Sequence, residues 1–112
     1  MIPRSALYSR FMKDPVSVRL GGIASDLARL SGLTKTSLNN ESRFQSVLDE
    51  TKFFTEWTAA DLSVDVQEKL LELQRVLVGW NGSLISRERL PSIEEEARDW
   101  SEKILLASGM NA

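Results

Sequence analysis

The sequence predicts an all-α protein, a four-helix antiparallel (up-down) bundle with a short N-terminal arm or helix. Apolar residues recur every three or four positions in four stretches, and residues that favour helix ends separate these stretches. Hardly any segment alternates between apolar and polar residues as a half-buried strand does. At 112 residues the chain has the size of one domain, predicted over 1–112. The helices are expected at about 15–31, 41–57, 64–80 and 93–107.

The N-terminal segment, residues 1–13, is predicted to form the arm. Leu7 with Phe11, and Tyr8 with Met12, are spaced four apart, so a short helix there has an apolar face. Basic residues gather in and just after it: Arg4, Arg10, Lys13, Arg19 and Arg29. They suggest nucleic-acid binding, with Tyr8 and Phe11 stacking on bases. The net charge of −2 for the whole chain disfavours this alternative, because such proteins usually have a clearly basic domain.

The first long helix is expected to start at Asp14 and Pro15, with Asp14 as N-cap and proline in the first turn. Its apolar stripe comprises Val16, Leu20, Ile23, Leu27 and Leu30. Gly32 is expected to end the helix in the left-handed conformation. Gly21 and Gly22 are unfavourable inside a helix, which suggests either a bend or the close approach of another helix.

The two central helices are predicted from similar signals. Asn40 is a good N-cap for the second, and either Thr58 or Ser63 for the third. The second stripe comprises Phe44, Val47, Leu48, Thr51, Phe54 and Trp57, and the third comprises Val66, Leu70, Leu73, Leu77 and Trp80. Asn81 and Gly82 are expected to end the third helix.

The fourth helix is predicted to start at Ser92, because Ser92-Ile93-Glu94-Glu95 matches the capping box. Pro91 is expected to close the preceding connection, and Gly109 to end the helix. The fourth stripe comprises Ile93, Ala97, Trp100, Ile104 and Ala107.

Composition excludes several classes of protein. The chain has no cysteine and no histidine, which removes disulfides, thiolate nucleophiles, the usual general base and the commonest metal ligand. No apolar run approaches the length that spans a bilayer, and nothing resembles a secretory signal, so we expect no membrane partner and a cytoplasmic location. Residues 1–35 carry a net charge of +4 and residues 36–112 a net charge of −6, so the two parts can attract each other.

The densest acidic patch runs from Glu94 to Asp99. Helical carboxylates three or four apart are able to hold Mg²⁺, and Glu96-Ala97-Arg98-Asp99 resembles one half of the acidic signature of all-α nucleotide pyrophosphohydrolases. That resemblance implies a magnesium-dependent enzyme as an alternative function. The same acids also complement the helix dipole, and Glu94 is placed to pair with Arg98, so a solvated surface is the favoured interpretation.

Adjacent apolar residues widen several stripes beyond what four helices need to bury. We therefore expect a non-enzymatic protein–protein interaction module, a homodimer in its simplest form, with no catalytic residue, cofactor or metal ligand. The candidate partner-binding residues are Tyr8, Phe11, Phe53, Leu71, Val78, Leu105 and Leu106.

Overall fold

The computed structural model describes residues 4–34, 41–80 and 88–109. Within these ranges there are five helices and no strand: α1 (Arg4–Met12), α2 (Val16–Leu33), α3 (Glu41–Ala59), α4 (Val64–Gly79) and α5 (Leu90–Ser108). The predicted all-α class is confirmed. Each of the four long helices covers its predicted range to within three residues at either end.

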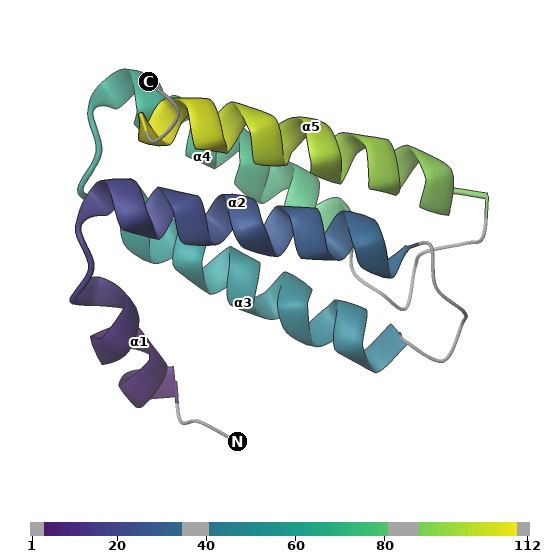
Figure 1. The fold of residues 1–112 in the computed structure, drawn as a ribbon, viewed down its shortest axis with the longest axis horizontal. Coiled ribbons are helices and arrows are strands. Elements are labelled where there is room, and N and C mark those ends of the chain that lie inside the picture. Colours follow the sequence, from purple (N-terminus) through teal and green to yellow (C-terminus); the bar gives the residue numbers. More distant parts are fainter. Residues whose placement is uncertain (1–3, 35–40, 81–87, 110–112) are drawn as a thin grey trace.

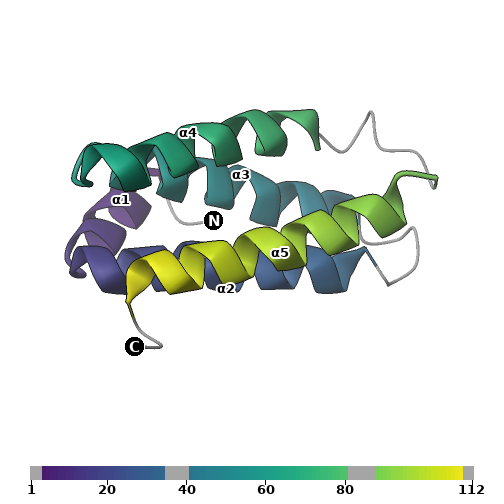
Figure 2. The same ribbon diagram turned by 90° about the horizontal axis from the view of Figure 1, so that it is seen from above.

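The four long helices lie side by side and alternate in direction along the chain (Figure 1). Helix α2 packs against both α3 and α5, and α4 packs against α3. Seen from above, α4 and α5 lie over α3 and α2 (Figure 2). The short helix α1 lies at an angle to α2 and contacts α3 (Figure 1). This arrangement is compatible with a four-helix bundle preceded by a short N-terminal helix.

Most of the core comes from the predicted stripes. Leu20, Leu73 and Trp100, one from each of three stripes, are 2%, 0% and 7% exposed. The largest fully buried apolar side chains are Trp80, Ile23, Leu27, Leu30, Leu48, Leu70, Leu73, Leu77, Ile93 and Ile104. Their burial removes large apolar areas from water, the dominant favourable contribution to folding.

Hydrogen bonds to backbone carbonyls fix neighbouring helices against each other. Ser101 on α5 donates to the Ala24 carbonyl of α2 at 2.7 Å. On α4, Gln74 donates to the Lys52 carbonyl of α3 at 3.1 Å, and Gln67 donates to the Ala59 carbonyl at 2.9 Å. These bonds satisfy buried or half-buried polar groups, so they position the helices as well as stabilise them.

The ends of α2 differ from the prediction. The helix starts at Val16 with Pro15 as N-cap, and it continues through Gly32 to Leu33. Gly32 has no positive φ, so the expected left-handed termination there is wrong. Instead Thr34 closes the helix in a right-handed conformation: its backbone N–H reaches the Leu30 carbonyl, and its hydroxyl donates to the Ser31 carbonyl at 2.7 Å. These bonds satisfy carbonyls of the last turn of the helix, which a glycine in the left-handed conformation would otherwise help to satisfy.

The later helix ends agree only in part. Ser63 is the N-cap of α4, although its side chain makes no capping hydrogen bond, and Gly109 ends α5 with a φ of 75°. The capping box at Ser92 is wrong, because α5 already starts at Leu90 with Pro91 in its first turn. Proline lacks the N–H that would be unsatisfied there, so it begins this helix rather than closing the segment before it. The predicted end residues Asn40, Asn81 and Gly82 lie outside the described residues.

Gly22 has room for a side chain. A Cβ built on it would lie 3.8 Å from Cε1 of Phe11, which is an ordinary contact with a side chain of α1 and no close approach of another backbone. We therefore expect Gly22→Ala to stabilise the protein by about 0.5–1 kcal/mol through helix propensity. Denaturant unfolding measures this, with Ala28→Gly at an exposed position of α2 as the converse control. Destabilisation by Gly22→Ala would contradict the assignment of open space beside α2.

Candidate functional site

The predicted partner-binding residues fall in three separate places. Tyr8, Phe11 and Phe53 lie where α1 meets α3, Leu71 and Val78 lie on α4, and Leu105 and Leu106 lie near the end of α5. The structure therefore does not gather them into one surface. The rest of the chain covers these three places to different extents.

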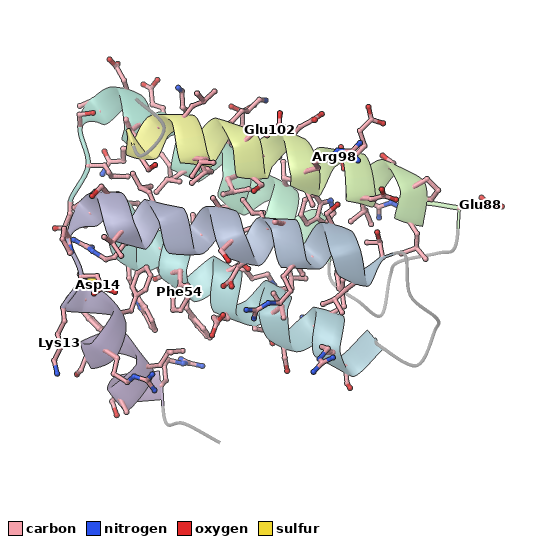
Figure 3. The ribbon with its side chains drawn as sticks, in the orientation of Figure 1. Lys13, Asp14, Phe54, Glu88, Arg98 and Glu102 are labelled. Atoms are coloured by element: carbon pink, nitrogen blue, oxygen red, sulfur yellow. The ribbon has the colours of Figure 1, made fainter. Side chains whose placement is uncertain are left out.

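Phe11 is buried, which removes it from the candidate surface. Its ring stacks on that of Phe54 with centroids 3.9 Å apart and planes 3° from parallel, and it is 8% exposed. Phe54 extends from α3 at the junction with α1 (Figure 3). A face-to-face apolar contact of this kind docks α1 on the bundle. The candidate residue is thus part of the core, because α1 folds back onto α3.

Further aromatic contacts surround this stack. Tyr8 lies 5.0 Å from Trp57, and Phe53 lies 5.6 Å from Trp57, measured between ring centroids. The guanidinium carbon of Arg4 lies 4.3 Å from the Phe53 ring centre, a cation–π contact. Phe53 is only half-buried, but Trp57 and Arg4 occupy its surroundings. Tyr8 remains 40% exposed, so this end of the molecule offers one partly free aromatic side chain.

Arg19, on α2, links the connection between α1 and α2 to the connection between α3 and α4. Its guanidinium is 2.9 Å from the carboxylate of Asp61, at the connection between α3 and α4. The same side chain donates to the Asp14 carbonyl at 3.0 Å and to the sulfur of Met12 at 3.3 Å. Arg19 is 6% exposed, so this cation, one of the five proposed for phosphate binding, is used inside the chain.

Exposed apolar residues also recur along α4 at Val64, Leu71 and Val78, which together we term the α4 stripe. The three residues are spaced seven apart and are 68%, 53% and 58% exposed. Gln67 and Gln74, each three or four positions from stripe residues, donate to carbonyls of α3. Since residues three and four apart share a helix face, the stripe follows the side of α4 that borders α3.

The exposed leucines of α5 form a smaller feature. Leu105 and Leu106 are 39% and 63% exposed near the C-terminal end of the helix. Glu102, four residues before Leu106, lies with Arg98 on the outer side of α5 (Figure 3). Charged side chains thus share the face on which Leu106 lies, so the apolar surface there is interrupted.

The acidic patch of α5 is engaged in contacts within the chain. Glu94 forms an ion pair with Arg98 at 3.7 Å, as the spacing predicts. Glu96 accepts a hydrogen bond from the indole N–H of the buried Trp80 at 3.3 Å, which ties α5 to α4. Because α5 starts at Leu90, these acids lie beyond its first turn. Within residues 4–34, 41–80 and 88–109, no group of three metal-ligating side chains is placed to share an ion.

Sequence reasoning missed a buried carboxyl between α2 and α3. Asp26 is 5% exposed, its Oδ2 has no hydrogen-bond partner, and its other oxygen is 3.9 Å from Arg29. Burial raises the pKa of Asp26 to about 8, the interaction with the carboxyl of Glu50 on α3 adds to the rise, and Arg29 opposes it. Asp26 is therefore mostly a neutral acid at neutral pH, where a carboxyl with an ordinary pKa is ionised.

A signal for this carboxyl is present in the sequence. Asp26 lies three residues after Ile23 and four before Leu30, so it falls on the buried stripe of α2. Beside it, an open surface groove of about 430 Å³ between α2 and α3 is lined by Arg29, Ser42, Arg43, Ser46, Val47 and Glu50. Most of its polar lining comes from one stretch of α3, and Arg29 comes from α2, so the lining is complete only once the two helices pack together.

Comparison with protein-family models, with curated proteins and with solved structures gives no match to this chain. Its candidate surfaces are therefore judged from the chemistry of their own residues. None of the helices in the described part of the chain combines the length and the apolar content needed to cross a bilayer.

Proposed function

We propose that this chain is a non-enzymatic interaction module, an up-down helical bundle that forms a homodimer through the α4 stripe. The observation that supports this function is the exposure of Val64, Leu71 and Val78 in one line. Apolar side chains that line up on one exposed helix face favour burial against a partner. A second copy of the chain offers the same stripe, so each copy covers the other.

The α4 stripe is favoured over the other two candidate places because it has three exposed apolar residues in one line, more than either of the others. At the α1 end, Phe11 is buried and Phe53 lies against Trp57. On α5, Leu106 follows Glu102 by four residues and so shares its helix face with a charged side chain. The α4 stripe spans 14 residues from Val64 to Val78, about 21 Å at the rise of an α-helix. That length suits the pairing of one helix with another along most of α4.

The composition agrees with a role that is not catalytic. The chain lacks histidine and cysteine, the side chains most used as general bases, nucleophiles and metal ligands near neutral pH. The acidic residues of α5 that resemble part of a pyrophosphohydrolase signature include Glu96, whose carboxylate accepts a hydrogen bond from Trp80. This contact gives Glu96 a structural role between α4 and α5.

We expect the protein to sediment at micromolar concentration as a dimer of twice its 12.6 kDa mass, and Leu71→Glu to sediment as a monomer. The substitution places a charge at the middle of the stripe, where pairing would bury it without a partner of opposite sign. Analytical ultracentrifugation over a range of concentrations measures the dissociation constant of both proteins.

Val18→Glu is the matched control, because Val18 is 43% exposed on α2 and lies off the stripe. We expect this variant to remain a dimer. Far-ultraviolet circular dichroism establishes that both variants keep their helices. A wild-type protein that stays monomeric, or equal weakening by the two substitutions, would refute the α4 homodimer.

A further inference from the structure

The proposed homodimer has a register that the residues around the stripe define, and this inference rests on the proposed function. We infer that the two α4 helices pair antiparallel, with Leu71 of each copy at the twofold axis. Val64 then lies opposite Val78 of the second copy, and Glu68 lies beside Arg75 of the second copy. One helix face thereby recognises itself.

The spacing of the stripe is the first argument. Val64 and Val78 each lie seven residues from Leu71, on opposite sides of it. A twofold axis perpendicular to the helix at Leu71 places Val64 of one copy at the same height along the helix as Val78 of the other copy. Three apolar layers then coincide in an antiparallel pair: one leucine layer between two valine layers. Repeats of seven are the spacing at which two helices keep a common seam.

The charges beside the stripe are the second argument. Glu68 follows Val64 by four residues, and Arg75 follows Leu71 by four, so both lie on the same flank of the stripe. Both residues are exposed, and neither takes part in an ion pair among the described residues. With the twofold axis at Leu71, Glu68 of one copy lies within one residue of Arg75 of the other copy along the helix axis. The symmetry makes this contact twice.

The opposite flank of the stripe is already occupied. Gln67 and Gln74 lie there, and both side-chain amides donate to carbonyls of α3. This flank is therefore bound to the chain's own neighbouring helix. The flank of Glu68 and Arg75 is left for polar contact with a second copy, where the acid of one copy complements the base of the other.

A parallel pair does not use these charges. In it, each stripe residue lies level with its own counterpart, so Glu68 is level with Glu68 and Arg75 with Arg75 of the second copy. No level then combines opposite charges. Flanking charges are what select the orientation of paired helices, so antiparallel pairing is the arrangement that this sequence favours.

Cysteine cross-linking tests the orientation directly, because the chain contains no cysteine of its own. We expect Leu71→Cys to form a disulfide-linked dimer on mild oxidation, since the two side chains meet at the axis. Val64→Cys alone should remain unlinked, because its two copies lie about 21 Å apart along the helix axis. A mixture of Val64→Cys and Val78→Cys proteins should form the mixed cross-link.

Charge reversal tests the flank independently. Glu68→Arg and Arg75→Glu are each expected to weaken dimerisation by about tenfold, because two attractive contacts become repulsive. The double variant Glu68→Arg/Arg75→Glu should return to within about threefold of the wild type. Efficient cross-linking of Val64→Cys to itself, or a double variant weaker than either single one, would overturn the register. If Leu71→Glu still abolished dimers, the proposed function would survive that result, whereas a monomeric wild type would refute both.

Discussion

Replacing Asp26 with asparagine is expected to stabilise the protein at high pH and to leave its stability at pH 4 almost unchanged. Asparagine has nearly the same shape as aspartic acid and carries no charge at any pH. Asp26 is 5% exposed with one oxygen unpartnered, so its ionised form is poorly accommodated in the folded chain. The variant keeps the packing between α2 and α3 and removes the ionisation.

The sign follows from the raised pKa of Asp26. This pKa is about 8 in the folded chain, compared with its ordinary value of 3.8. Below pH 4 the group is protonated in both the folded and the unfolded chain, so it has no effect on the pH dependence. Between pH 4 and pH 8 only the unfolded chain releases the proton, so stability falls by up to about 1.4 kcal/mol per pH unit. Above pH 8 the penalty is constant and on the order of 5 kcal/mol.

Urea unfolding of wild type and Asp26→Asn at pH 4, 6 and 9 measures this effect. We expect the variant to gain about 3 kcal/mol or more at pH 9, and the difference to grow steadily with pH. Asp99→Asn, at an exposed position of α5, is the matched control, and a change within about 0.5 kcal/mol is expected. A constant difference between Asp26→Asn and wild type at all three pH values would contradict a neutral buried acid.

The stripes were predictable because helix periodicity determines which side chains share a face. Leu20, Leu73 and Trp100 are buried as their spacing requires, whatever the details of the helix ends. The positions of the helix ends depend instead on which local hydrogen bonds the terminal residues can form. Thr34 rather than Gly32 closes α2 because its backbone and hydroxyl both find carbonyl partners. Pro91 opens α5, and a capping-box pattern two residues later has no effect on where the helix starts.

The candidate surfaces were only partly predictable, because exposure depends on which helices become neighbours. The sequence predicts Leu71 and Val78 to be surplus apolar residues, and both are exposed on α4. Phe11 was assigned to the same set, but α1 folds back and stacks it on Phe54. The position of α1 depends on its tertiary contacts with α3, which the periodicity of a nine-residue helix does not specify.

The contribution of that tertiary contact is testable through Phe11→Ala. Its ring is 8% exposed, stacks on Phe54 at 3.9 Å and lies 6.0 Å from Trp57 between ring centroids. Truncating a buried phenylalanine to alanine typically lowers the free energy of unfolding by about 3–5 kcal/mol. We expect a loss near the lower end of that range, because α1 can detach while the stripes of α2–α5 stay buried.

Amide hydrogen exchange locates this loss within the chain. In Phe11→Ala the amides of α1 should exchange much faster than in wild type, while those of α2 and α5 keep most of their protection. Tyr8→Ala, which removes a neighbouring ring that is 40% exposed, is the control and should change both measurements less. Equal loss of protection in all helices would mean that α1 and the bundle unfold as one unit. The Phe11–Phe54 stack would then contribute to the common core, and α1 would have no separate docking equilibrium.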